Sequence, residues 1–158
     1  MTPIVRKATL KDLPTLLSFE QGVIEAERPF DPTIKTGNIA YYDISELITS
    51  ENSEVYVDEI EGDIVASGYA KIKPDRHYLK HTQQGYLGFM YVSEKHRGKQ
   101  LNKLIIDALL HWCKNKNVFE IRLDVYQDNL PAIKSYEKAG FKKHMINMRL
   151  DIKNLKTD

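Results

Sequence analysis

The longest regular pattern of apolar positions in the chain lies near residues 98–115. Apolar side chains recur there at steps of three and four, which marks one face of a helix. These side chains are Leu101, Leu104, Ile105, Ala108, Leu109 and Trp112. A nearly continuous apolar run at residues 86–92 precedes them, which is typical of a central strand covered on both faces. The pattern therefore predicts a strand over 85–92, a basic turn containing Gly98, and a long amphipathic helix.

The rest of the chain divides into shorter apolar patterns. Strands are expected at 4–8, 54–60, 64–72, 120–126 and 142–152, mostly from alternation of apolar and polar positions. Further helices are expected from about 12 to 28, around 42–48, and from about 129 to 139. Within the central strand, Gly88 indicates a bulge, a close backbone approach or simple relief of packing.

The order of these elements predicts the fold class. The strand, helix and strand between residues 85 and 126 should form a parallel crossover, and the strands at 54–60 and 64–72 should form an antiparallel hairpin. A mixed α/β sheet with helices on both faces follows. The length of 158 residues predicts one domain, 1–158, with a frayed tail at 153–158.

Composition restricts the classes of partner. A formal net charge of +1 gives no reason to expect binding to nucleic acid or to a membrane surface. No apolar run is long enough for a membrane span and no secretory signal is recognisable, so a cytoplasmic location is expected. The single cysteine, Cys113, lies in the long helical pattern and is expected to be a buried or half-buried thiol.

The turn between the central strand and the long helix is a candidate phosphate site. The start of a helix offers free backbone N–H groups and a positive dipole end, and Arg97 and Lys99 add positive charge. We therefore expect a cofactor that carries a diphosphate to bind here. The alternative is a basic turn that only faces solvent.

Two segments resemble the cofactor motifs of the GNAT superfamily of N-acetyltransferases. Residues 97–102, Arg-Gly-Lys-Gln-Leu-Asn, resemble its pyrophosphate motif, although Gln100 and Asn102 stand where the motif has glycine or alanine. Non-glycine residues are sterically allowed at a helix start, and either amide could donate a hydrogen bond. Residues 129–141 resemble the second motif, N-x-x-A-x-x-x-Y-x-x-x-G-F, which contains Asn129, Ala132 and Tyr136.

The resemblance implies an acyltransferase that uses acetyl-CoA. An amine would attack the thioester directly through a tetrahedral intermediate, whose charge a backbone N–H near Met90 or Tyr91 would stabilise. Tyr136 would be the general acid for the leaving thiolate. The implied cofactor contacts are Met90, Tyr91, Val92, Arg97, Gly98, Lys99, Gln100, Leu101, Asn102, Asn129, Ala132 and Tyr136.

The sequence does not single out a general base or an acceptor. Glu25, Glu27, Asp43 and Asp124 are all candidate bases, and a water chain or an amine that arrives neutral is an equal alternative. The acceptor is expected to be a small-molecule or peptide amine, bound between the 28–43 connection and the 74–82 loop. Candidate acceptor contacts are Glu27, Phe30, Tyr42, Asp43, Tyr78 and Asp124. His77 and His81 are four residues apart in a polar loop, and no metal is expected.

Three functions remain open at this stage. The first is an N-acetyltransferase, possible as a homodimer. The second is an acyl-CoA sensor without catalytic activity, and the third is an interaction domain that keeps the fold without the ligand. Fold alone does not choose among them.

Overall fold

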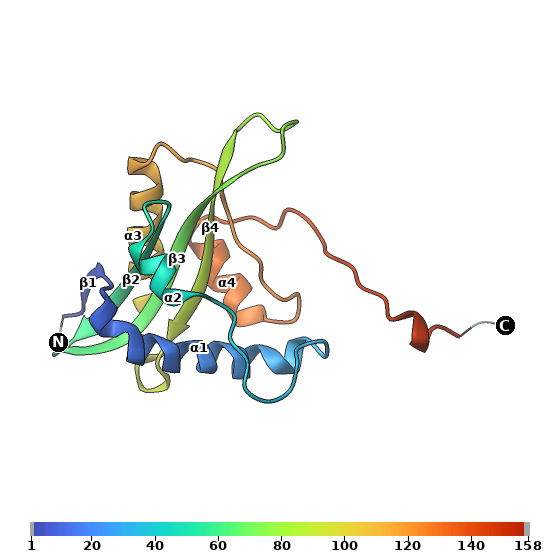
Figure 1. Cartoon of the computed structure of the whole chain (residues 1–158), viewed down its shortest axis with the longest axis horizontal. Coiled ribbons are helices and arrows are strands. Elements are labelled where there is room, and N and C mark those ends of the chain that lie inside the picture. Colours follow the sequence, from blue (N-terminus) through green and yellow to red (C-terminus); the bar gives the residue numbers. More distant parts are fainter. Residues whose placement is uncertain (1, 157–158) are drawn as a thin grey trace.

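A five-stranded mixed sheet organises the molecule, whose computed structural model describes residues 2–156 (Figure 1). Its strands are β1 (Ile4–Lys7), β2 (Ser53–Ile60), β3 (Asp63–Pro74), β4 (Gln83–Val92) and β5 (Ile121–Arg122), in the spatial order β1-β2-β3-β4-β5. The pairs β1–β2, β2–β3 and β3–β4 are antiparallel, and β5 lies parallel to β4.

Helices cover both faces of this sheet. Helices α1 (Leu13–Glu27) and α2 (Ile44–Thr49) pack on one face, against Val55, Val57 and Phe89. Helix α3 (Leu101–Asn115) packs on the other face, and α4 (Leu130–Lys138) follows β5. The predicted mixed α/β sheet with helices on both faces is therefore confirmed. Among residues 2–156, no helix has the length and apolarity that crossing a bilayer requires.

Helix α3 lies very close to the sheet because a glycine faces it. A Cβ placed on Gly68 would lie 2.5 Å from a methyl group of Ile105 and 2.6 Å from the sulfur of Met90. A larger residue would therefore push α3 away from β3 and β4. The contact fixes the start of α3 relative to the middle of β4.

The only cysteine is part of the same layer. Cys113 on α3 is fully buried, and a Cβ on Gly85 of β4 would lie 2.8 Å from its sulfur. Burial raises the pKa of the thiol to about 11. The predicted buried thiol is confirmed.

The C-terminal part of the chain departs from the sequence-based prediction. The strand expected at 142–152 is wrong, because residues 142–150 adopt no regular secondary structure and are all exposed. The segment leaves the body of the molecule and ends in a single 3-10 turn, Ile152–Asn154 (Figure 1). We call residues 142–155 the C-terminal arm. Part of the tail expected to fray thus forms this turn, and residues 157–158 lie outside the described part.

The strand expected at 120–126 is also shorter than predicted. Only Ile121 and Arg122 pair with β4, although apolar residues alternate further along the segment. A strand needs a neighbouring backbone as well as an alternating pattern, and here the two backbones diverge. This divergence opens the region described next.

Candidate active site

A bulge in β4 forms the centre of the candidate site. Tyr69 pairs with Gly88 and Ser67 pairs with Tyr91, so Phe89 and Met90 together oppose Gly68. Phe89 has a positive φ of 58°, and the hydroxyl of Ser67 donates a hydrogen bond of 3.1 Å to its carbonyl oxygen. A Cβ on Gly88 would lie 2.6 Å from the Tyr69 ring. The bulge that Gly88 indicated is present one residue further on, and Gly88 itself relieves packing against the Tyr69 side chain.

Beyond this bulge, one edge of β4 is open. Strand β5 pairs with β4 only at Gly85 and Tyr86, so within the described residues β4 has no strand partner on that side from residue 87 to 92. An unpaired edge offers N–H and C=O groups to any extended chain that lies beside it. The edge contains Met90, Tyr91 and Val92, three of the residues expected to contact a cofactor.

The turn before α3 offers a cradle for an anion. In the described part of the chain, the backbone N–H groups of Gly98, Lys99 and Gln100 donate to no backbone acceptor. Gly98 has a φ of 82°, and a Cβ built on it would meet nothing within 4 Å. Free N–H groups and open space at the start of a 15-residue helix suit a phosphate group. The residues present therefore fit a diphosphate.

Gln100 and Asn102, which stand at the glycine positions of the motif, differ in backbone conformation and in side-chain contacts. Gln100 has a φ of 60°, in the left-handed region that favours glycine, so the expectation of an unstrained helix start is wrong at this residue. The amide of Asn102 donates to the Ser135 hydroxyl at 3.3 Å and thereby links α3 to α4. The side chain of Asn102 is therefore held by α4.

Helix α4 contributes the candidate acid. The side chain of Asn129 caps the helix by accepting a hydrogen bond from the N–H of Ala132 at 3.4 Å. Tyr136 is half-buried, and its ring lies edge-on to Phe141 at 6.0 Å. Burial, together with the negative charge of Glu27, raises the pKa of the Tyr136 phenol to about 12. The phenol therefore keeps its proton at neutral pH and can donate it.

The structure separates the four candidate bases. Glu27 ends α1, and burial raises the pKa of its carboxyl group, with Asp31 adding to the effect and the Tyr41 hydroxyl opposing it. Glu25 is 69% exposed and pairs with Arg28. Asp43 is occupied as the N-cap of α2, and Asp124 accepts a hydrogen bond of 3.0 Å from the Tyr86 hydroxyl. Of the four, only Glu27 contributes through its charge to the raised pKa of the Tyr136 phenol.

Aromatic residues lie beside a neighbouring carboxylate, that of Asp31. The rings of Phe30 and Tyr126 stack at 6.0 Å, and the hydroxyl of Tyr126 donates to Asp31 at 2.8 Å. Sequence reasoning included Phe30 but missed Tyr126. Its signal was its position as the last residue of the predicted strand 120–126, because functional residues gather at the ends of parallel strands.

A buried carboxylate holds the acceptor loop in place. Glu20 is 1% exposed, and it accepts hydrogen bonds from the backbone N–H groups of Tyr41 at 2.9 Å and Tyr42 at 2.8 Å. This residue was also missed, although a glutamate within the apolar stripe of α1 was a recognisable signal. Through Glu20, helix α1 positions the segment that carries both tyrosines.

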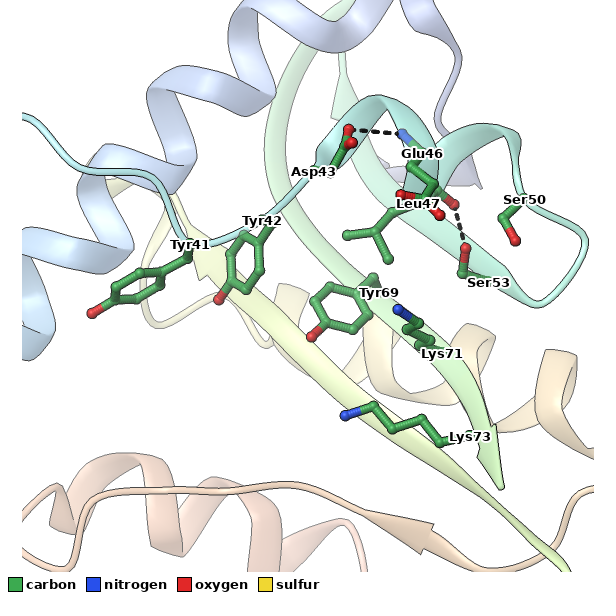
Figure 2. Close-up of a pocket in the computed structure, with 10 residues that line it drawn as sticks. All are labelled: Tyr41, Tyr42, Asp43, Glu46, Leu47, Ser50, Ser53, Tyr69, Lys71 and Lys73. Carbon is green, nitrogen blue, oxygen red and sulfur yellow. Dashed lines mark hydrogen bonds between the residues drawn. The ribbon is translucent and has the colours of Figure 1, made fainter. Parts of the chain in front are cut away.

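A pocket of about 200 Å³ opens between α2 and β3 (Figure 2). Tyr41, Tyr42 and Asp43 line one end, and Lys71 and Lys73 follow Tyr69 along β3. Within the described residues neither lysine forms a salt bridge, although the ammonium group of Lys73 lies 4.1 Å from the centre of the Tyr86 ring. The pocket thus combines phenols with two cations.

One expected acceptor contact lies elsewhere. Tyr78 belongs to the loop between β3 and β4, at the opposite end of β4 from the bulge, and it is 65% exposed. Its hydroxyl accepts a hydrogen bond from Arg76 at 2.9 Å. The structure therefore does not place Tyr78 with the other candidate residues. Among residues 2–156, no three His, Cys, Asp or Glu side chains gather in a way that could hold a metal ion.

Comparison with known proteins adds to this geometry. Residues 21–141 match the family model described as the acetyltransferase (GNAT) family. A glucosamine 6-phosphate N-acetyltransferase of Arabidopsis thaliana is 30% identical over 95 residues, which are 60% of each chain. The chain spans 23% to 65% of the length of the curated relatives it matches.

Solved structures resemble the fold over nearly its whole length. A mutant protein of Bacillus halodurans has a TM-score of 0.84 and 25% identity, with 94% of this chain and 98% of that chain covered. A predicted acetyltransferase of Clostridium acetobutylicum, solved with acetyl-CoA, has a TM-score of 0.72 and 21% identity, with 98% and 99% covered. At 21% identity, the similarity to the second structure supports the fold alone.

Proposed function

The chain belongs to the acetyltransferase (GNAT) family, and we propose that it transfers the acetyl group of acetyl-CoA to a primary amine. The observation that carries the proposal is the open edge of β4, which is followed directly by the turn that begins α3. The acceptor would be a small molecule or a peptide with a lysine or N-terminal amine. A cytoplasmic location is part of the same proposal.

The open edge and the turn suggest how acetyl-CoA would be held. The N–H groups of Gly98, Lys99 and Gln100 would bind the diphosphate, with Arg97 and Leu101 beside them. The backbone from Met90 to Val92 would pair with the extended arm of the cofactor, and Asn129 and Ala132 would contact that arm from α4. When bound, acetyl-CoA supplies an activated thioester.

Groups of the protein would then transfer protons and stabilise the negative charge that develops during the reaction. Glu27 accepts a proton from the acceptor ammonium group, which leaves a neutral amine able to attack the thioester carbonyl. A backbone N–H near Met90 or Tyr91 stabilises the negative charge that develops on the carbonyl oxygen. Attack would form the carbon–nitrogen bond first, and the carbon–sulfur bond would then break as Tyr136 donates its proton to the departing thiolate. The amide nitrogen would release its second proton, which would return the Tyr136 phenolate to the phenol.

The pocket between α2 and β3 supports an acceptor with an anionic group. Lys71 and Lys73 would bind the anion, while Glu27 and Asp31 would attract the amine. Two curated relatives are glucosamine 6-phosphate N-acetyltransferases, so an amino sugar phosphate is the first acceptor to assay. We expect a lower KM for glucosamine 6-phosphate than for glucosamine. Lys71→Met should reduce this preference, and Lys80→Met, on the distal loop, should not.

The central experiment combines acetyl-CoA binding with turnover. Acetyl-CoA at about 100 times its Kd should stabilise the folded protein by ~2.7 kcal/mol, which is a rise of several degrees in Tm. Tyr136→Phe should keep that rise and lower kcat by about 10²-fold or more. Tyr78→Phe is the matched control, because it removes a phenol that lies away from the site.

Each result selects one of the three functions. A rise in Tm with turnover that depends on Tyr136 supports the enzyme. A rise in Tm with no turnover on a broad panel of amines would favour the acyl-CoA sensor. No rise would mean that Gln100 closes the diphosphate site, and the interaction domain would remain.

A further inference from the structure

Glu20 is a buried carboxylate that the proposed chemistry does not use. It lies in the middle of α1, and its Oε2 atom accepts hydrogen bonds from the backbone N–H groups of Tyr41 at 2.9 Å and Tyr42 at 2.8 Å. In the described part of the chain, these two N–H groups donate to no backbone acceptor. Burial of a carboxylate is unfavourable unless hydrogen bonds compensate for its lost hydration, so the position of Glu20 is linked to these two bonds.

Further contacts fix this part of the acceptor loop, residues 39–42, at both ends. The side-chain amide of Gln21 on α1 donates to the carbonyl oxygen of Ile39 at 2.9 Å. The Tyr42 ring lies edge-on to Tyr69 of β3 at 5.5 Å and points toward it in Figure 2. The loop is therefore anchored to α1 at one end and to the sheet at the other.

Helix α1 is itself held against β4 at the candidate site. A Cβ on Gly22 would lie 2.6 Å from the ring of Tyr91, and the centres of the Phe19 and Tyr91 rings are 4.7 Å apart. The helix cannot approach β4 more closely without displacing Tyr91, which follows the bulge. Glu20 thus connects the acceptor loop to a helix that packs directly on the strand expected to hold the cofactor.

The hydroxyl of Tyr41 reaches the candidate base. Burial raises the pKa of the Glu27 carboxyl group, and a hydrogen bond from the Tyr41 hydroxyl opposes that rise. Burial and the contact with Glu27 raise the pKa of the Tyr41 phenol to about 12, so the phenol keeps its proton at neutral pH and can donate it to this bond. The backbone that carries this phenol is the one that Glu20 holds.

Other charged and titratable groups also face Glu27. They come from the acceptor loop, the turn after α1, the segment after β5 and helix α4, and they are Tyr42, Asp31, Tyr126 and Tyr136. Each of them interacts with Glu27 through charge. Among the described residues, the hydrogen bond that acts on this carboxyl group comes from Tyr41.

We propose that Glu20 is a positioning residue for acetyl transfer. By holding the backbone N–H of Tyr41, it directs the Tyr41 hydroxyl to the Glu27 carboxylate and so sets the hydrogen bond at the base. Glu20 acts through Tyr41 and contacts neither the acceptor nor the cofactor. The inference rests on the proposed function, in which Glu27 removes a proton from the acceptor.

The main measurement is the acid limb of the pH–rate profile, over which the rate rises as Glu27 loses its proton. Tyr41→Phe removes the hydroxyl that lowers the pKa of Glu27, so the limb should move upward by roughly one pH unit. Glu20→Met removes the acceptor of both N–H groups with a side chain of similar length, and it should move the limb in the same direction. The value of kcat/KM should then fall about tenfold below the limb and change little above it.

A conservative variant and a neighbouring variant are the controls. Glu20→Gln keeps an oxygen that can accept both N–H bonds, so the limb should stay near its wild-type position. Gln21→Met removes a hydrogen bond to the same loop but leaves that of the Tyr41 N–H intact, and it should not move the limb. The double variant Glu20→Met with Tyr41→Phe should show only the shift of Tyr41→Phe alone, because both changes break the same connection.

Three results would overturn the proposal. A rate that falls at every pH in Glu20→Met, with an unmoved limb, would show a structural role only. Additive shifts in the double variant would mean that Glu20 acts by a route other than Tyr41. An equal shift in Gln21→Met would mean that any loosening of the loop has the same effect. If the Tm shows that Glu20→Met does not fold, Glu20→Asp, which withdraws the carboxylate by one methylene, takes its place with the same expected direction.

Carbon-13 NMR of the Glu27 carboxyl group separates this proposal from the proposed function. Its resonance is assigned by its loss in Glu27→Gln, and its titration gives the pKa of Glu27 without any turnover. That pKa should rise in Glu20→Met and in Tyr41→Phe, and it should stay unchanged in Glu20→Gln. A wild-type chain that acetylates no amine contradicts the proposed function, whereas an unchanged titration of Glu27 in Glu20→Met contradicts the role of Glu20.

Discussion

At the scale of single residues, burial changes the chemistry of two groups that are distant in sequence. Glu27 ends the first long helix and Tyr136 lies on the last one, yet the charge of Glu27 acts on the phenol. Burial raises the pKa of both groups. A carboxylate with a raised pKa is a better base, and a phenol with a raised pKa stays protonated. These directions match the proposed roles.

The role of Glu27 predicts a specific pH dependence. Because its pKa is raised, the carboxylate becomes competent only above the ordinary range for glutamate, about 4.3. The rate should therefore rise with pH along an acid limb displaced upward from that value. Glu27→Gln should lower kcat/KM by about 10²-fold and abolish this limb in a steady-state pH profile.

Glu25→Gln is the control for this prediction, since Glu25 lies on the same helix and faces solvent. Retention of the acid limb in Glu27→Gln would assign the base to water or to another group.

A second carboxyl group affects stability. Asp58 is fully buried, neither of its oxygens has a hydrogen-bond partner in the described residues, and burial raises its pKa to about 7. The folded state therefore binds a proton that the unfolded state releases above about pH 4. Stability should fall as pH rises from about 4 to about 7, by on the order of 4 kcal/mol.

Asp58→Asn removes this titration. The variant should be more stable than the wild type at pH 8, and the difference should vanish toward pH 4. Urea unfolding at pH 4 and at pH 8 measures this difference in the free energy of unfolding. Asp107→Asn, on the exposed face of α3, should show no such pH dependence.

At the scale of secondary structure, the sequence predicts best the elements whose pattern is local. The stripe of α3 and the cap of α4 depend on neighbours within a few residues, and both were found as expected. The C-terminal strand failed because alternation identifies an apolar face without showing which backbone will pair with it. Glu20 and Tyr126 were missed because their partners, Tyr41, Tyr42 and Asp31, come from distant segments.

The start of α3 predicts an unusual response to glycine. Gln100 is held in the left-handed region, which costs a non-glycine residue roughly 1 kcal/mol. Gln100→Gly should therefore leave the free energy of unfolding unchanged or raise it by up to about 1 kcal/mol, and acetyl-CoA should bind at least as tightly. Chemical denaturation and calorimetry measure the two effects.

The control is a substitution to glycine at the preceding residue, Lys99. Lys99 has no positive φ, so Lys99→Gly should lower stability by about 0.5–1 kcal/mol through the entropy of the unfolded chain. Equal losses in both variants would show that Gln100 is not strained.

At the scale of the whole molecule, the sheet consists of two parts with different roles. Strands β1 to β4 form a continuous antiparallel ladder, while β5 diverges from β4 after two residue pairs. The ladder provides rigidity and the divergence provides access. A site of this kind is formed between separate elements. Sequence motifs therefore indicate that the site exists, but they do not show how its parts are arranged in space.

This division predicts where acetyl-CoA would slow amide hydrogen exchange. Protection should increase at residues 87–92 and in the turn from Arg97 to Gln100, since their N–H groups would gain partners. Exchange in β1, at the far edge of the sheet, should not change. Mass spectrometry of peptic fragments can measure both. Protection spread evenly over all strands would indicate general stabilisation without a bound arm at β4.

The burial of Cys113 has a practical consequence for enzymology. Its thiol is enclosed between α3 and β4 and has a raised pKa, so we expect it to react slowly with aromatic disulfide reagents. Every acetyl transfer would release one free thiol of coenzyme A. A colorimetric thiol assay can therefore follow turnover continuously and without correction for the protein. The same reagent, added after denaturation, counts the molecules present, so a single chemistry would report both enzyme concentration and rate.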